Sequence, residues 1–313
     1  MVRVLDGIDA FLDQLAAVDP LPVLLAVLAQ LAKLTCTSLA WRNVLASAYP
    51  DSAVRRRSIV GAYLAGVGVN AIVPLRAGDA VRVLLAHRAV VGSTYTTIVS
   101  STLVLSIFDI TAASTLLAWA ALTQDALPGL GDLPELPSFD FSWLLDHALA
   151  AELLLATLII AAVVVGIWIH GHVVDFWERV KQAFAVVRRP ALYLRTVAFW
   201  QAGDWIFRLI AIWFLLDAFD IPQTPENVLL VQVSASIATL LPLTPAGIGT
   251  EQAFLLYAFQ GTVPSSQLLA FSVGLKFMTV GTNVVAGFTA IAVTLRTLRY
   301  KQALGAPEDA ASP

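Results

Sequence analysis

Three charged residues follow one another at intervals of three in the segment 70–82, NAIVPLRAGDAVR. Arg76, Asp79 and Arg82 would share one face of a helix that begins after Pro74, as a cation–anion–cation ladder. An arginine binds phosphate through two parallel hydrogen bonds and keeps its charge when partly desolvated. The same spacing is also typical of snorkelling side chains, whose charged ends extend to the membrane interface without binding a ligand. We favour phosphate binding, because the adjacent proline and glycine indicate a built turn.

A second candidate stretch, LPLTPAGIGTEQ (241–252), lies between two apolar runs that are each too short to cross a bilayer. Its prolines and glycines would break a helix, and Glu251 follows at once. Broken backbone at membrane depth is tolerated only where it is buried in protein or lines a wet cavity, and a carboxylate there suggests function. The alternative is a surface loop with Glu251 in water. Glu251 would either cap the helix that starts there or pair with a cation from another helix. Lys276, about a third of the way into the last apolar run, is the obvious candidate for that cation.

Further charges lie inside the long apolar runs. Asp204 and Arg208 are four residues apart, one turn after Gln201, and are either a neutralised structural pair or part of the site. Lys33 and Asp109 are also intramembrane charges that could line the same cavity. The candidate substrate-binding residues are Asn70, Pro74, Arg76, Gly78, Asp79, Arg82, Asp204, Arg208, Pro245, Gly247, Gly249, Glu251 and Lys276.

Several kinds of chemistry are not indicated by the sequence. It contains no phosphate-binding loop, nucleophile elbow or metal-ligand cluster, and the single cysteine, Cys36, excludes an internal disulfide. Serine and threonine are present without an identifiable paired base, so an intramembrane enzyme is the least favoured interpretation. We therefore expect no catalytic residue, metal, cofactor or nucleic-acid partner. Aromatic residues near the run ends are interpreted as interface anchors rather than a ligand cage: Trp41, Tyr49, Trp143, Trp177, Tyr193 and Tyr300.

The composition predicts an all-α, polytopic membrane protein. Of the 313 residues, 58% are hydrophobic and 13% are charged, and the mean hydropathy is +0.79. A soluble domain is roughly 45–50% apolar and about 25% charged. Five runs are long enough to span a bilayer: Leu21–Ala48, Thr94–Leu122, Trp143–Ile169, Leu192–Phe219 and Leu268–Leu295.

The chain is predicted to form one transmembrane domain over residues 20–298. Residues 1–19 place four aspartates opposite apolar residues, as in an amphipathic helix at the membrane interface. Residues 299–313 are polar and small, and we expect a disordered cytoplasmic tail.

The distribution of lysine and arginine predicts which segments face the cytoplasm of a cell membrane. Arg55–Arg57, the basic segment His170–Pro190 and the basic start of the tail are predicted to be cytoplasmic. The acidic loops Thr123–Phe141 and Asp217–Asn227 contain no lysine or arginine and are predicted to face outside.

Two short, broken runs complete the topology. For the long helices to alternate, Ile59–Arg88 must enter and leave on the cytoplasmic side, and Asn227–Gln260 must enter and leave outside. Each is therefore predicted to be a re-entrant hairpin, so that the chain contains an inverted repeat. Inverted repeats whose broken elements meet at the midplane are a transporter design.

Both broken stretches resemble signatures of the flippase-like membrane family that includes the transmembrane flippase part of bacterial lysylphosphatidylglycerol synthases. The resemblance covers roughly residues 5–298. The signature N…P-x-R-x-G-[ED]-x-x-R resembles Asn70, Pro74, Arg76, Gly78, Asp79 and Arg82. The signature P-x-[ST]-P-G-G-x-G-x-x-E resembles Pro242, Pro245, Gly247, Gly249 and Glu251.

The sequence departs from the family pattern at a few positions. Asp79 stands where glutamate is usual, Ala246 replaces the first glycine of a pair, and Glu251 comes one residue early. We expect no aminoacyl-transferase domain in this sequence, so the resemblance does not imply the synthase reaction.

The resemblance implies translocation of an anionic or aminoacylated phospholipid, or of a lipid-linked precursor. The alternative is a non-transporting accessory subunit that binds a lipid or a lipid-modifying synthase.

Overall fold

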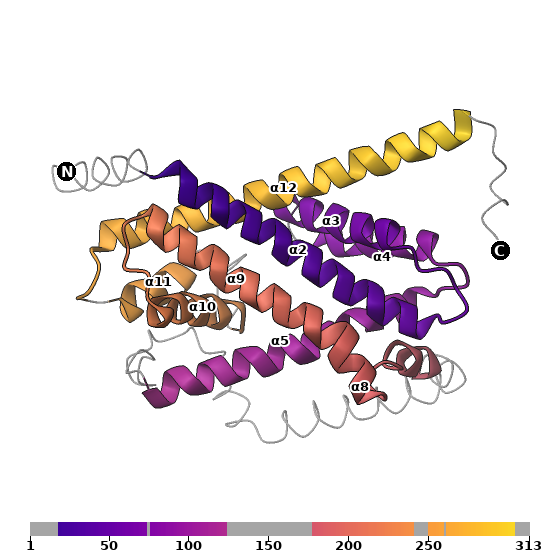
Figure 1. The fold of residues 1–313 in the computed structure, drawn as a ribbon, viewed down its shortest axis with the longest axis horizontal. Helices are drawn as coiled ribbons and strands as arrows, with labels where there is room; N and C mark the ends of the chain where they lie inside the picture. The colour runs from indigo at the N-terminus through magenta and orange to yellow at the C-terminus, as the bar shows by residue number, and fades with distance from the viewer. Residues whose placement is uncertain (1–17, 74–75, 124–176, 241–249, 260, 304–313) are drawn as a thin grey trace, which may run out of the picture.

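The computed structural model describes residues 18–73, 76–123, 177–240, 250–259 and 261–303, and this part of the chain is helical without a β-strand. The all-α prediction is confirmed for these residues. Figure 1 labels α2 (Pro20–Ala48), α3 (Arg56–Ile72), α4 (Ala77–Ala89), α5 (Tyr95–Thr123), α8 (Pro190–Tyr193), α9 (Phe199–Ala218), α10 (Pro225–Leu240), α11 (Thr250–Ala258) and α12 (Ser265–Ala303). The π-helical η1 (Leu194–Ala198) lies between α8 and α9.

Within the described residues, four helices are long and apolar enough to cross a membrane. They correspond to four of the five predicted long runs: Pro20–Ala48, Tyr95–Ala120, Pro190–Ala218 and Ser265–Val293. The fifth, Trp143–Ile169, lies outside the described residues. The first begins sharply because the Asp19 side chain accepts a hydrogen bond from the Leu21 amide and prolines occupy the first turn. The third joins α8, η1 and α9 through one π-helical turn.

Two shorter helix pairs correspond to the predicted hairpins. Helices α3 and α4 pack against each other, as do α10 and α11. Glycine is required where α3 meets α4: a Cβ at Gly78 would overlap the carbonyl oxygen of Gly66 and lie 2.7 Å from the Asn70 amide nitrogen. Their re-entrant placement in a membrane stays a prediction.

Helix α3 also crosses α12 at close range. A Cβ added at Gly68 would lie 2.6 Å from the Cα of Gly287. Such small-residue crossings let helix backbones approach closely in membranes. The first hairpin is therefore held between its own partner helix and the last helix of the bundle.

The two ends of the bundle carry opposite charge, as the sequence predicts. At one end the loops after α2 and α4 meet, because the Ser52 hydroxyl donates a hydrogen bond to the Val91 carbonyl. The segment that contains Gln182 joins them there, because the Gln182 side chain donates to the Ala48 carbonyl. Arg55–Arg57 and Arg179–Arg189 lie in these joined segments, which form the basic end. At the other end the Gln267 side chain donates to the Phe219 carbonyl. The acidic residues there are Asp19, Asp217, Asp220 and Glu226.

The apolar core lies where α9 packs along α2, the most extensive helix contact in the described part of the chain. Toward the acidic end, Leu215, Phe259 and Phe271 are fully buried with residues of α2, α10, α11 and α12. Toward the basic end, Trp41, Leu45 and Ile98 are buried with residues of α3 and α4. Many exposed side chains are large and apolar, Phe277 and Val285 among them, as expected for helices that contact lipid.

Some predictions lie outside the described residues. These are the amphipathic segment 1–17 and the tail 304–313, together with Pro74, Pro242, Pro245, Gly247 and Gly249. Helix α12 extends to Ala303, into the segment for which the composition predicts a tail.

Candidate functional site

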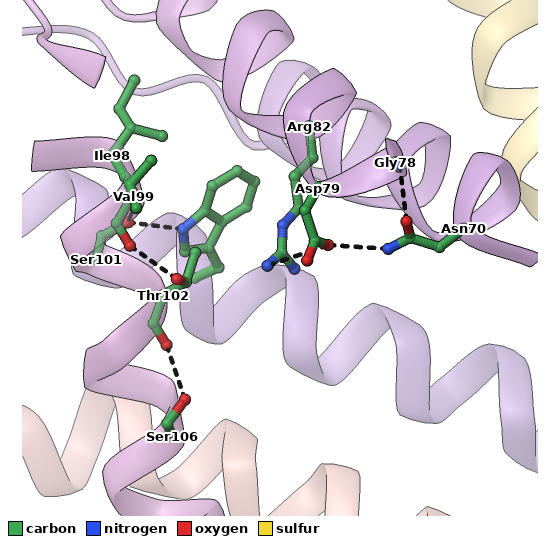
Figure 2. Close-up of polar contacts among 10 residues, drawn as sticks. Asn70, Gly78, Asp79, Arg82, Ile98, Val99, Ser101, Thr102 and Ser106 are labelled. Carbon is green, nitrogen blue, oxygen red and sulfur yellow. Dashed lines mark hydrogen bonds and ion pairs between the residues drawn. The ribbon is translucent and has the colours of Figure 1, made fainter. Parts of the chain in front are cut away.

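The turn of the first hairpin is fastened by Asn70 at the end of α3. Its side-chain oxygen accepts the Gly78 amide at 2.7 Å, and its Nδ2 donates to Asp79 Oδ1 at 2.9 Å. Figure 2 shows Asn70, Gly78, Asp79 and Arg82 together across the two helices. Asn70 thus satisfies one of the free amides at the start of α4 and orients the carboxylate that faces Arg82. Three of the predicted site residues are brought together by one amide side chain.

Arg82 lies in the middle of this group. Its Nη2 is 3.4 Å from Asp79 Oδ1, and its guanidinium lies 5.8 Å from the Trp41 ring centroid and 6.0 Å from that of Tyr63. The side chain is 21% exposed, and its Nε is buried without a hydrogen-bond partner. The two rings fix the planar guanidinium by cation–π contact. Arg82 is therefore positioned while one of its donors stays unsatisfied.

The predicted three-residue ladder is only partly correct. Helix α4 begins at Ala77, and Arg76 precedes it in the left-handed conformation, with φ of 57°. A residue outside the helix does not share the helical face of Asp79 and Arg82, so only that pair forms. Arg76 is exposed at the turn, and its carbonyl accepts the Asp79 amide at 2.9 Å.

The interpretation of Trp41 as an interface anchor is wrong. Trp41 is fully buried, and its Nε1 donates to the Ser101 hydroxyl of α5 at 2.8 Å. Tyr49 is also buried, and its hydroxyl accepts the Thr94 amide. Trp41 lies on the face of α2 that packs into the bundle, and Tyr49 directly follows this helix; the position near a run end did not reveal the burial of either ring. Trp177, by contrast, is 56% exposed, as an interface residue would be.

In the second hairpin, the expected ion pair between Glu251 and Lys276 is confirmed. Lys276 Nζ of α12 lies 2.5 Å from Glu251 Oε2 in the first turn of α11. The Glu251 side chain is 5% exposed and the Lys276 side chain 39% exposed. The carboxylate is also favoured by the amide end of α11. The interpretation of Glu251 as a surface residue in water is therefore wrong.

A third charged group joins α2, α5 and α9. Asp204 accepts the Thr37 hydroxyl at 2.5 Å and the Arg208 guanidinium at 2.7 Å, and it is 2% exposed. Asp109 accepts the indole Nε1 of Trp205 at 3.0 Å. The Asp204–Arg208 pair predicted from the spacing is therefore present, and it is not an isolated intrahelical pair.

This group is continuous with the first hairpin. The Tyr63 ring, whose centroid lies 6.0 Å from the Arg82 guanidinium carbon, also lies close to the Thr37 side chain. Thr37 in turn donates to Asp204. A line of polar contacts thus runs from the hairpin through α2 to α9. In the described part of the chain, no hydrogen bond or ion pair joins this line to Glu251 and Lys276.

Sequence reasoning missed several members of these contacts. Tyr63 and Ser101 carry no local signal, because each acts through a residue on another helix. Gln30 of α2 donates to Asn283 of α12 at 3.1 Å, and their amides inside apolar runs were the available signal. Among the described residues, no group of three or more metal-ligating side chains occurs.

The comparisons identify the family. The family model described as "Lysylphosphatidylglycerol synthase TM region" matches residues 2–287. Comparison with curated proteins and with solved structures gives no match. The matched range contains both hairpins and all three charged groups, and the chain belongs to the family of the lysylphosphatidylglycerol synthase transmembrane region.

Proposed function

We propose that this multi-pass membrane protein moves a phospholipid, or another lipid-linked anionic substrate, across the cytoplasmic membrane. The observation that carries the proposal is the arginine group in the first hairpin. Arg82 is fixed between an aspartate and two aromatic rings, and Arg76 lies exposed at the adjacent turn. A fixed, charged group on short helices is costly in a membrane unless it meets a polar substrate or water.

The roles follow from exposure. Arg76 is free to bind the phosphate of an arriving headgroup, because no described side chain pairs with it and it is exposed. Arg82 would receive the phosphate next, since it keeps an unsatisfied Nε. Asp79 and Asn70 hold Arg82 and the turn in place. Gly78 permits the close contact on which this arrangement depends.

The second hairpin supplies a charge pair rather than a free cation. Exchange of Lys276 between Glu251 and a lipid phosphate would let the pair open and close with the substrate. With the first hairpin entering from the basic end and the second from the acidic end, the two would meet near the midplane. The turn residues Pro245, Gly247 and Gly249 belong to this proposal as sequence-based candidates.

A second candidate function is a non-transporting accessory subunit that binds a lipid or a partner synthase. The matched family is named after a synthase region, and this observation favours the candidate. It predicts copurification with a lipid-modifying enzyme and no transfer in liposomes. We propose no catalytic role for the chain itself.

The test is a transport assay in proteoliposomes with fluorescent phosphatidylglycerol and membrane-impermeant dithionite as quencher. We expect protein-dependent transfer that falls about tenfold or more in Arg76→Ala and Glu251→Gln, as for loss of a charge-assisted contact. Arg88→Ala is the control, because this exposed arginine lies at the basic end of α4. Unchanged transfer in both variants would remove these residues from the mechanism, and no transfer by the unmodified protein would contradict the proposal.

A further inference from the structure

The third charged group lies close to the middle of three spanning helices. Lys33 is central in α2, Asp109 in α5, and Asp204 with Arg208 in the Pro190–Ala218 helix. Lys33 lies one helical turn before Thr37, whose hydroxyl lies within hydrogen-bond distance of the Lys33 carbonyl and of Asp204. The middle of a bilayer is where ionised side chains are most costly. Two cations and two carboxylates at this depth indicate a binding site rather than side chains that reach the membrane interface.

The carboxylates of this group accept hydrogen bonds from neighbouring side chains. Both oxygens of Asp204 accept hydrogen bonds, one from Thr37 and one from Arg208. One oxygen of Asp109 accepts the Trp205 indole. None of these hydrogen bonds comes from the Lys33 ammonium.

The donors, by contrast, are left over. Within the described residues, the Lys33 ammonium forms no hydrogen bond and no ion pair, although Lys33 is partly buried. Arg208 uses Nη2 for Asp204, but its Nε is buried without a partner. An ammonium that lacks a partner inside an apolar helix bundle is expensive. The unpaired Lys33 ammonium and the unpaired Arg208 Nε would both suit an acceptor-rich, anionic ligand.

We propose that Lys33 and Arg208 form a second phosphate-binding station, midway along the bundle and separate from the hairpin turn. This inference rests on the proposed lipid transport, since it gives the headgroup a next position after Arg82. The polar contacts through Tyr63 and Thr37 lead from the hairpin to this station. Phosphate suits it because its oxygens can accept from both cations at once. The ligand is a lipid headgroup or free phosphate, which share this chemistry.

Native mass spectrometry of the full chain in detergent tests the station, with dioleoylphosphatidylglycerol as the probe. We expect Lys33→Met to weaken its binding about tenfold or more, the loss expected for one charge-assisted hydrogen bond. Lys33→Arg should restore binding to within roughly threefold, because the charge returns. Lys181→Met is the matched control, since Lys181 lies at the basic end and pairs with Glu178. A phosphate-free lipid, diglucosyldiacylglycerol, should bind equally to all variants.

Free phosphate is distinguished by adding inorganic phosphate alone. If it raises the melting temperature of the unmodified protein but not of Lys33→Met, the site holds free phosphate as well as lipid. If it has no effect while phosphatidylglycerol binding depends on Lys33, the ligand is the lipid. Either result supports the station.

Two results would overturn it. One is a folded Lys33→Met variant that binds phosphatidylglycerol as the unmodified protein does. The other is full recovery of binding in Lys33→Met/Asp109→Asn, which would mean that Lys33 only balances the charge of Asp109.

Failure of the station differs from failure of the proposed function. Transport that depends on Arg76, with binding indifferent to Lys33, would refute the station alone. Binding that depends on Lys33 in a protein that transfers no lipid would refute the transport proposal alone.

Discussion

The ion pair between α11 and α12 gives the sharpest stability prediction. Lys276→Met would leave the Glu251 carboxylate, 5% exposed, without its partner 2.5 Å away. Removing one member of a fully buried pair costs about 3–5 kcal/mol. Because 39% of the Lys276 side chain meets solvent, we expect a smaller loss of unfolding free energy, about 2–3 kcal/mol.

The double variant Glu251→Gln/Lys276→Met removes both charges together. Its free energy of unfolding should lie within about 1 kcal/mol of the unmodified protein, because no charge is left buried. The expected coupling energy is therefore about 2 kcal/mol. Equilibrium unfolding by dodecyl sulfate in mixed micelles, followed by tryptophan fluorescence, measures each variant.

The pair of Lys181 and Glu178 is a matched control within the same chain. Its atoms are 2.7 Å apart and its lysine is also 39% exposed, but its carboxylate is 65% exposed. The same double-mutant cycle should give no measurable coupling energy, because solvent screens an exposed pair. Additive effects in the Glu251–Lys276 cycle, or equal coupling in the two pairs, would refute the inference that burial of the carboxylate decides the energy.

Three further predictions concern single contacts. Gly78→Ala should destabilise the protein by about 3 kcal/mol or more, because the added Cβ would overlap backbone atoms. Gly281→Ala is the control and should cost less than about 0.5 kcal/mol, because the space around Gly281 is open. Similar melting temperatures of the two variants would contradict this prediction. Trp41→Phe should cost about 1–3 kcal/mol, because it leaves a buried hydroxyl without its donor, and an unchanged midpoint of unfolding would argue against that hydrogen bond. The Lys181 ammonium lowers the pKa of Glu178 from its ordinary value of 4.5. The pair therefore stabilises the fold above pH 4.5, and this contribution is lost as the pH falls through the lowered pKa. Lys181→Met should return the pKa of Glu178 toward 4.5 in an NMR titration, and an unchanged pKa would contradict the pairing.

The long helices and the polarity of the bundle could be predicted from the sequence. Apolar runs of spanning length are a strong signal, and lysine and arginine gather in segments that the structure joins at one end. The Glu251–Lys276 pair was predictable for a related reason, because an unpaired charge in such a run is expensive.

Side-chain packing and backbone conformation at the site could not be predicted in the same way. Arg76 matches the helical spacing, but its left-handed conformation ends the ladder at Asp79. Trp41 lies near a run end, where interface anchors are common, yet the register of α2 turns its ring toward α5. Contacts made between helices depend on rotation about each helix axis, which hydropathy along one chain does not specify.

The proposed mechanism depends most directly on Arg76 lying at membrane depth, at the turn of a hairpin that enters from the basic end. Replacing the only cysteine, Cys36, by serine provides a background for single cysteines at positions 76, 88 and 226. An impermeant maleimide should label Arg88→Cys quickly from the cytoplasmic side and Glu226→Cys quickly from outside. Arg76→Cys should react only from the cytoplasmic side and at least tenfold more slowly than Arg88→Cys, as for a group reached through a confined path. Labelling of Arg76→Cys as fast as Arg88→Cys, or labelling from outside as fast as Glu226→Cys, would contradict the account.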